Sequence, residues 1–295
     1  MTQKILAFVT SMLLLLAAQP QAIFRPKQLL PLLQGQWGVL AGELEAYKEF
    51  KYDIIIVAGQ SNAVGCGLGE VANPFVPRDD IMMMPQPANE LGGHSIMRAE
   101  EPILEGQPWG NFGLYFARAY VEAGRLAPGR KVLVLQAAVG GTGFSDKRWR
   151  LHDDLYRNML LMIDTALALN PENELKALLW HQGETDAIMK ACKTTHKANL
   201  KALVNGVRAR YNAPNLPFIA GDFVQDWKQD NARICAPVVA AIRAVCNCVG
   251  SAAFVETDGL QSNAEAVGNG DDIHFCRAAQ YELGARYFEK YQTLV

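Results

Sequence analysis

Ser61 is the first residue of this sequence whose type and setting could do chemistry. It follows an apolar run that ends at Gly59, within the segment GQSNA. A serine at a tight turn from a strand into a helix presents its hydroxyl beside backbone N–H groups that can stabilise an oxyanion. A serine there can also simply cap the helix, and position alone favours that role. The segment is not the G-x-S-x-G elbow of α/β-hydrolases, because Ala63 replaces the second glycine.

Asp271 and His274 change that balance. They form a D-x-x-H pattern in a polar turn before the last helix-like segment. A serine is a poor nucleophile until a histidine takes its proton, and the histidine works best when a carboxylate fixes its tautomer. Asp272 is a rival carboxylate but is less able to fold back onto the imidazole. The pattern predicts Ser61 as the nucleophile, His274 as the base and Asp271 as its partner.

Acyl transfer also needs N–H donors for the tetrahedral oxyanion. Two glycine-rich or amide-bearing segments, AVGGTGF and WHQGETDA, follow strand-like runs and could supply them. The candidate donors are the backbone N–H of Ser61, a backbone N–H of Gly140 or Gly141, and the side-chain amide of Gln182.

Other residues with functional side chains give weaker signals. Glu184 and Asp186 could be the acid and base of a glycosidase, or metal ligands together with His181. No second carboxylate cluster or histidine pair supports either interpretation, so no metal site is expected. His196 is expected on a helix surface, and Trp149 is the best candidate for a wall of a sugar site.

The elements that must position these residues alternate along the chain. Short apolar runs suit strands buried on both faces, and longer amphipathic stretches suit helices. The predicted strands are 53–59, 131–138, 175–183, 216–222 and 251–257, and the predicted helices are 112–125, 153–166, 193–211, 234–246 and 277–292. This alternation predicts a three-layer α/β/α sandwich with a central, mainly parallel five-stranded sheet. The polar segments then gather at the carboxyl edge of that sheet.

Composition narrows the class of protein. The chain has 295 residues, of which 50% are hydrophobic and 20% charged, and a formal net charge of -2. This is enough for a large buried core, and the balanced charge offers no basic surface for a nucleic-acid backbone. We therefore expect a compact globular domain that does not bind nucleic acid.

The N-terminus has the features of a secretory signal peptide. One lysine precedes an apolar run at 5–18, which is shorter than the roughly 20 residues of a membrane span. We predict a signal peptide at 1–22, a leader or linker at 23–52 and one domain at 53–295, with an uncleaved signal anchor as the alternative. After cleavage the protein would be extracellular, without stable membrane insertion.

Export would make the cysteines candidates for disulfide bonds, since thiols tend to pair in oxidising compartments. The sequence does not define the pairing, and two of the six stand too close together to bridge each other. The six are Cys66, Cys192, Cys235, Cys246, Cys248 and Cys276.

Taken together, four ordered blocks resemble the SGNH hydrolase superfamily, in its branch of acetylxylan esterases and sialate O-acetylesterase-like proteins. The blocks are IIIVAGQSNAVG, AVGGTGF followed by Trp149, WHQGETDA and DDIHF, and the resemblance covers roughly 53–290. It implies the flavodoxin-like SGNH fold, with Gln182 in place of the asparagine of other members. Gln60, Asn62 and Glu184 would support the site, Glu184 by bracing its loop. Gly143 departs from the family, where serine is common.

The resemblance implies a secreted serine esterase that removes O-acetyl groups from a carbohydrate through an acetyl-enzyme on Ser61. It needs no metal or organic cofactor, because the nucleophile, the base and the oxyanion donors are protein groups. Two alternatives remain: a lipase or thioesterase of the same superfamily, and a carbohydrate-binding protein that kept the fold without activity.

Overall fold

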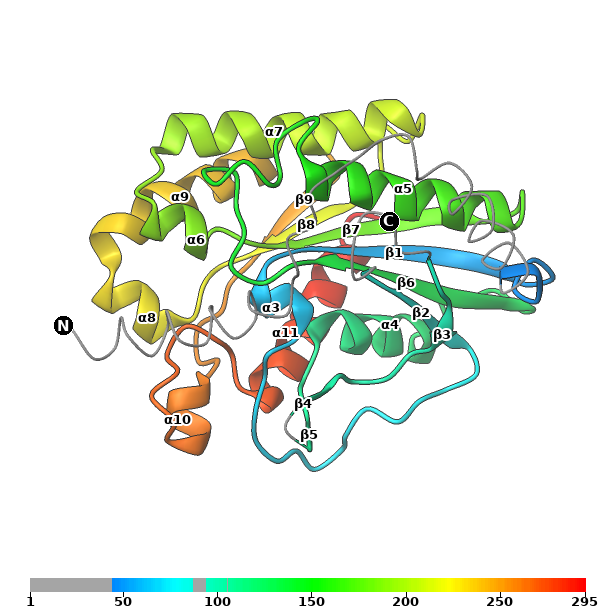
Figure 1. The fold of residues 1–295 in the computed structure, drawn as a ribbon, viewed down its shortest axis with the longest axis horizontal. Helices are drawn as coiled ribbons and strands as arrows, with labels where there is room; N and C mark the ends of the chain where they lie inside the picture. Colours follow the sequence, from blue (N-terminus) through cyan, green and yellow to red (C-terminus); the bar gives the residue numbers. More distant parts are fainter. Residues whose placement is uncertain (1–43, 87–93, 105) are drawn as a thin grey trace, which may run out of the picture. The chain divides into compact units, whose positions relative to one another are not determined.

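A seven-stranded sheet forms the centre of the protein in its computed structural model, which describes residues 44–86, 94–104 and 106–295 (Figure 1). The strands of this sheet are β1 (Lys51–Gly59), β2 (Ile81–Pro85), β3 (Met97–Arg98), β6 (Arg130–Ala138), β7 (Glu174–His181), β8 (Phe218–Gly221) and β9 (Ala252–Val255). Their order is β3-β2-β6-β1-β7-β8-β9. All neighbours are parallel except β2 and β3. A separate antiparallel pair is formed by β4 (Ile103–Leu104) and β5 (Gln107–Pro108).

The central strand β1 lies in the middle of the sheet because its own middle residues are β-branched and apolar. Ile54, Ile55, Ile56 and Val57 have no exposed surface. Such runs fit parallel strands that are covered on both faces. Because β1 pairs with β6 on one side and β7 on the other, its end at Gly59 lies in the middle of the carboxyl edge of the sheet.

Helices cover both faces of the sheet. The described helices are α3 (Ser61–Val64), α4 (Phe112–Glu122), α5 (Asp154–Leu169), α6 (Glu184–Ile188), α7 (Lys193–Arg210), α8 (Gln225–Asp230), α9 (Ala232–Cys246), α10 (Asn263–Val267) and α11 (Arg277–Gln292). α4 and α11 pack together on one face, and α5, α7 and α9 lie on the other (Figure 1). The fold class predicted from the sequence, a three-layer α/β/α sandwich, is confirmed.

The strand count is the part of the fold prediction that needs correction. All five predicted strands are present, but the sheet has seven strands because β2 and β3 extend one edge. β2 is short and ends at Pro85, and β3 has only two residues. Neither produces an apolar run long enough to be recognised from the sequence. β2 depends on its pairing with β6, and β3 on its pairing with β2.

The N-terminal predictions lie largely outside the described residues. The signal peptide at 1–22 and most of the leader at 23–52 belong to the part of the chain before residue 44. Within residues 44–86, 94–104 and 106–295, no helix combines the length and the apolar character needed to span a bilayer.

The predicted disulfides are not formed. All six cysteines lie in the described residues, and each has a free thiol. Cys235 and Cys246 lie near opposite ends of α9, so helix geometry keeps them about 16 Å apart, well beyond bridging distance. Cys192 and Cys248 are exposed, whereas Cys276 is buried.

Candidate active site

The turn from β1 into α3 brings Ser61 to the carboxyl edge of the sheet. A Cβ atom at Gly59 would lie 2.1 Å from the carbonyl oxygen of His181, and Gly59 has a φ of +135°. Only glycine permits this close approach and this backbone conformation. The N–H of Ala63 donates to the carbonyl of Gln60 at 2.8 Å, which turns the chain sharply into the helix that Ser61 begins.

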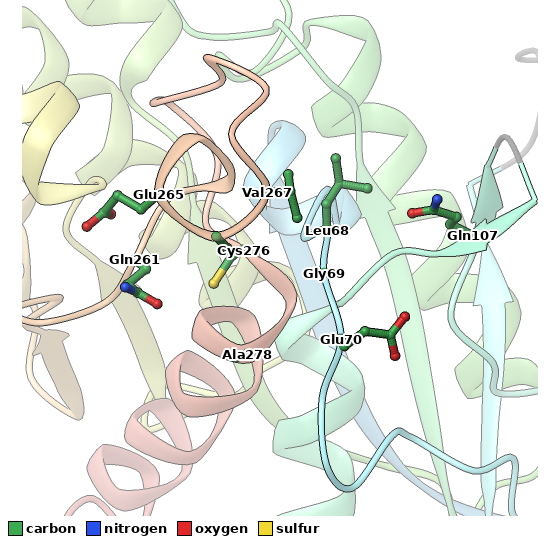
Figure 2. A pocket seen from close by; sticks show the side chains of 10 residues that line it. Leu68, Gly69, Glu70, Gln107, Gln261, Glu265, Val267, Cys276 and Ala278 are labelled. Carbon is green, nitrogen blue, oxygen red and sulfur yellow. The ribbon is translucent and has the colours of Figure 1, made fainter.

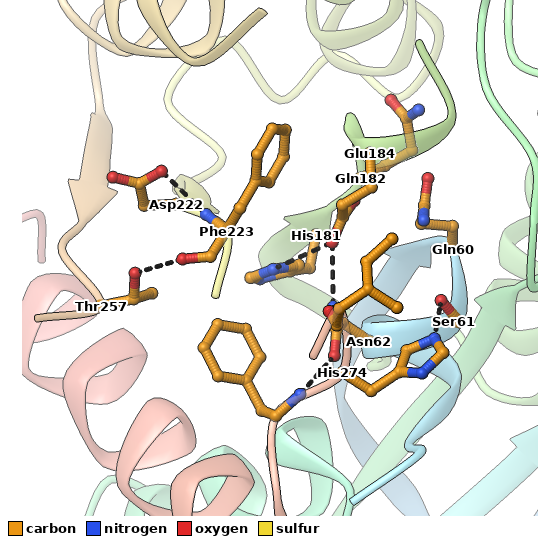
Figure 3. Close-up of polar contacts among 12 residues, drawn as sticks. Gln60, Ser61, Asn62, His181, Gln182, Glu184, Asp222, Phe223, Thr257 and His274 are labelled. Atoms are coloured by element: carbon orange, nitrogen blue, oxygen red, sulfur yellow. Dashed lines mark hydrogen bonds and ion pairs between the residues drawn. The ribbon is translucent and has the colours of Figure 1, made fainter. Parts of the chain in front are cut away.

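Ser61, His274 and Asp271 form a continuous chain of hydrogen bonds. The Nε2 atom of His274 lies 2.8 Å from the Oγ atom of Ser61, 213 positions away in the sequence (Figure 3). Its Nδ1 atom lies 2.9 Å from each carboxylate oxygen of Asp271. Burial raises the pKa of Asp271, but the bonds with His274 outweigh it and bring the pKa below its ordinary value. An ionised Asp271 favours a proton on Nδ1 and leaves Nε2 free to accept one from Ser61.

Asn263 holds this acid in place, and the sequence analysis did not identify it. Its side-chain amide donates to Asp271 Oδ2 and to the carbonyl of Cys66, both at 2.9 Å, and accepts from the N–H of Leu68 at 2.8 Å. The amide therefore joins the loop after α3 to the acid. The capping box that begins α10 at Ser262 could have marked the helix, but not the direction of this side chain.

Gly140 and Gly141 follow β6 and face the serine. A Cβ atom at Gly140 would lie 3.7 Å from the Cβ atom of Ser61, and Gly141 has a φ of +68°. Among the described residues, none accepts a hydrogen bond from the backbone N–H of Ser61, Gly140 or Gly141. These N–H groups remain available to a ligand.

The loop that carries these glycines is fixed from inside the protein. The Thr142 hydroxyl donates to the carbonyl of Val139 at 2.7 Å and accepts from Nε1 of Trp149 at 2.9 Å. Trp149 is fully buried and packs edge-on against Trp180. The expectation that Trp149 lines a sugar site is therefore wrong: its ring is part of the core and its indole N–H anchors the loop.

The Gln182 amide is directed away from Ser61 (Figure 3). Its Nε2 atom lies 2.7 Å from Asp186 Oδ2 and 3.3 Å from the carbonyl oxygen of Thr142. Both N–H groups of this amide thus have acceptors within the protein. The Gln60 side chain lies nearer to the serine, and its Oε1 atom accepts from the N–H of Thr185 at 3.1 Å.

Asn62 and Glu184 connect α3, the helix that begins at Ser61, to the loop that carries His274. The Asn62 side chain donates to Glu184 Oε1 at 2.9 Å and to the carbonyl of Ile273 at 3.1 Å, and accepts from the N–H of Phe275 at 3.1 Å (Figure 3). Glu184 has no exposed surface, and burial raises its pKa. Burial also lowers the pKa of the neighbouring His181 to about 3. The bracing role that the family resemblance implies for Glu184 stays a prediction.

Asp186 and His196 form another buried cluster, beside the glycine loop. Asp186 accepts from the N–H groups of Phe144 and Ser145 at 2.9 and 2.8 Å, which ties the glycine loop to α6. His196 lies with Nδ1 3.6 Å from Asp186 and is almost fully buried, so the expectation of a surface position is wrong. Burial lowers its pKa. Within the described residues, no group of three or more His, Cys, Asp or Glu side chains is arranged to hold a metal.

A pocket of about 610 Å³ lies beside the loop that carries Asp271 and His274 (Figure 2). Its polar lining comes from Glu70, Gln107, Gln261 and Glu265, and Leu68 and Val267 contribute apolar surface. Carboxylates and amides beside small apolar patches suit ligands that carry both hydroxyl and C–H groups.

A parallel α/β/α sandwich with a serine after its central strand, and an aspartate and histidine in its last loop, defines an SGNH-type hydrolase. The family model described as "Carbohydrate esterase, sialic acid-specific acetylesterase" matches residues 51–293. The chain belongs to this family of carboxylic ester hydrolases.

Known proteins resemble the chain in sequence and in fold. A probable carbohydrate esterase of Arabidopsis thaliana is 28% identical over 183 residues, which is 56% of this chain and 66% of that protein, just under two thirds of its length. The crystal structure of the same Arabidopsis protein has a TM-score of 0.62 at 20% identity, covering 82% of this chain and 98% of that one.

Two further crystal structures share the fold. That of NanS has a TM-score of 0.66 at 18% identity and covers 82% of this chain and 97% of that one. A carbohydrate acetylesterase from Xanthomonas citri has a TM-score of 0.56 at 16% identity, covering 82% of this chain and 56% of that one. At these identities the likeness concerns the fold.

Proposed function

We propose that the protein removes O-acetyl groups from a carbohydrate through an acetyl-enzyme on Ser61. The observation that carries this proposal is the hydrogen-bonded chain from Ser61 Oγ through His274 to Asp271. It lies at the carboxyl edge of the sheet, beside N–H groups that have no acceptor within the described residues.

Acylation begins when Ser61 Oγ attacks the acetyl carbonyl carbon and its proton passes to Nε2 of His274. The carbonyl electrons move onto oxygen, where the backbone N–H of Ser61 and that of Gly140 or Gly141 stabilise the negative charge. Collapse of this intermediate breaks the bond to the sugar oxygen, which takes the proton from His274. Asp271 stabilises the imidazolium while it exists.

Deacylation repeats these steps with water as the nucleophile. His274 Nε2 takes a proton from the water as its oxygen attacks the acetyl-serine, and a second tetrahedral intermediate forms in the same N–H pocket. Its collapse releases acetic acid, which loses its proton to the solvent, and returns the proton held by His274 to Ser61 Oγ, so the residues end as they began.

The family and the pocket support the proposed substrate class. The matching family model is described as a sialic acid-specific acetylesterase, and the Xanthomonas citri structure as a carbohydrate acetylesterase. The amide and carboxylate groups of Glu70, Gln107 and Gln261 would hydrogen-bond sugar hydroxyls. Export is part of the proposal: the apolar run at 5–18 supports a signal peptide, and N-terminal sequencing of protein recovered outside cells tests it.

Hydrolysis of 4-nitrophenyl acetate, of a long-chain acyl ester and of acetylated glycans tests the proposal. We expect turnover of the acetyl esters and little of the long-chain ester, and we expect Ser61→Ala to abolish turnover. Ser95→Ala, a change of an exposed serine, is the matched control. A preference for the long chain would indicate a lipase or thioesterase, and wild-type protein without Ser61-dependent turnover would indicate a binding protein.

A further inference from the structure

The pocket of about 610 Å³ borders both ends of the loop 268–275, which carries the acid and the base (Figure 2). Glu265 lines the pocket before this loop, and Cys276 lines it directly after the loop. Asn263 accepts from the N–H of Leu68, another lining residue, at 2.8 Å and donates to the acid of the loop at 2.9 Å. A sugar bound in this pocket therefore lies against the residues that hold the acid and the base in place.

Two carboxylates line this pocket without a counterion. Glu70 is exposed and forms no ion pair with any residue that the structure describes. Glu265 is also exposed, and its Oε2 atom accepts from the N–H of Ser262 at 2.7 Å, whereas its Oε1 atom has no partner in the described part of the chain. Figure 2 shows the two glutamates on opposite sides of Leu68 and Val267, so negative charge lies on two sides of the pocket.

No lysine or arginine offsets these charges in the segments 66–70, 106–110 and 257–276, which supply nearly all of the lining. These three segments are described throughout and contain five acidic residues. Arg277 follows them, but it is only 6% exposed and donates to Glu101 Oε2 at 2.6 Å. A carboxylate on a ligand would find no cation to pair with, although proteins that bind carboxylates commonly supply an arginine or a lysine.

We propose that the pocket selects neutral acetylated sugars over acidic ones, with Glu70 and Glu265 as the specificity-determining residues. This inference rests on the proposed function. Two like charges about 7 Å apart in water weaken binding about threefold, and a concave pocket strengthens the effect. The hydroxyls of a neutral sugar instead donate hydrogen bonds to the same carboxylates. The matching family is described by sialic acid, an acidic sugar, so the preferred substrate of this chain differs from that description.

Pairs of sugars that differ only in charge test this selection. O-acetylated sialic acid and O-acetylated galacturonic acid are each compared with the carboxamide of the same sugar, which is neutral and has nearly the same shape. We expect kcat/KM for the carboxamide to exceed that for the acid about tenfold, because two carboxylates each contribute about threefold. Added salt should narrow this ratio, since salt screens charges that are exposed to solvent.

Replacing both carboxylates by amides should remove the selection. In the double variant Glu70→Gln, Glu265→Gln, we expect the ratio of carboxamide to acid to fall below about threefold and to lose its dependence on salt. Glutamine keeps an oxygen for the Ser262 N–H, so α10 keeps its cap. Glu289→Gln, the same change at an exposed position near the end of α11, is the matched control and should keep the wild-type ratio. A ratio measured within one variant does not depend on its folded fraction.

Three results would overturn this selection. The first is a wild-type ratio of at most about threefold, and the second is a larger ratio that the double variant retains. The third is turnover of 4-nitrophenyl acetate without turnover of either sugar in either form. Each of them requires an active wild type. Wild-type protein that hydrolyses no acetyl ester at all would instead reject the proposed function, so the two failures are distinguishable.

Discussion

Three carboxylate–histidine pairs lie in the part of the chain that the structure describes, and one of these three adjoins a nucleophile. In the pair of Asp271 and His274, the side chains are 27% and 20% exposed and make two hydrogen bonds of 2.9 Å. In the pair of Glu184 and His181, both side chains have no exposed surface and the nearest atoms are 3.9 Å apart. The pair of Asp186 and His196 resembles the second, with the atoms 3.6 Å apart and almost no exposure.

The difference shows that residue type alone does not make a base. Burial lowers the pKa of both His181 and His196, so each imidazole takes up a proton less readily than an exposed histidine does. His274 is partly open and has a carboxylate on one nitrogen and a hydroxyl on the other. Proton transfer needs that arrangement, whereas the buried pairs serve packing and loop geometry.

Substitution of Asp271, the acid of the partly exposed pair, is expected to have the largest effect and tests whether this pair differs from the two buried ones. Asp271→Asn presents an amide to His274 and favours the wrong tautomer, so we expect kcat for acetyl esters to fall by about 10³–10⁴-fold. The melting temperature should change little. Asp272→Asn is the matched control and should keep kcat within threefold. Equal losses in the two variants would contradict the pairing of Asp271 with His274.

The same pair predicts the pH dependence of the wild type. Acidification should abolish turnover, because protonated His274 cannot accept the Ser61 proton. The lowered pKa of Asp271 keeps its carboxylate charged to a more acidic pH than an ordinary aspartate would. A rate that stays constant from neutral to acidic pH would contradict the assignment of His274 as base.

A buried histidine predicts an effect on stability instead. Burial lowers the pKa of His181 from 6.5 to about 3. Below pH 6.5 the unfolded chain binds a proton that the folded protein refuses, so the free energy of unfolding falls as pH drops towards 3, by at most about 1.4 kcal/mol per pH unit from this group. His181→Leu removes that contribution.

Urea unfolding at several pH values measures the pH-dependent contribution of His181 to the free energy of unfolding. The variant should be less stable at neutral pH, because it loses the contact of Nδ1 with the Tyr287 hydroxyl, but its stability should depend less steeply on pH than that of the wild type. An unchanged slope would mean that His181 is protonated in the folded protein.

The features of the fold and site that could be predicted from the sequence are those set by residues close together in the chain. The strands around β1 and the helices that cover them follow from local periodicity, and the D-x-x-H pattern carries its own spacing. Periodicity does not report which helix face a second layer covers, so His196 and Trp149 were misplaced. Nor can it reveal the direction of an amide: Gln60 is oriented by Thr185, which lies 125 positions away.

The cysteines also differ in exposure, and their substitution is expected to have the smallest effect on turnover. Burial raises the pKa of Cys66 to about 12, whereas hydrogen bonds from Thr195 lower that of the exposed Cys192. Because the thiolate is the reactive form, a maleimide should label the exposed Cys192 within minutes and the partly exposed Cys66 far more slowly. Mass spectrometry of peptides gives the result. Cys192→Ser should leave acetyl-ester turnover within twofold, and labelling of Cys66 as fast as that of Cys192 would contradict the raised pKa of the Cys66 thiol.

The 213 positions between Ser61 and His274 bear on how the protein is made. During translation, β1 emerges long before its partners β6 and β7, and the nucleophile emerges long before its base. Asn263 and Asp271 must also reach the loop at Cys66 before the acid is held in place. A nascent chain therefore carries a serine that cannot react, and catalytic competence arrives only when the last loop closes onto the edge of the sheet.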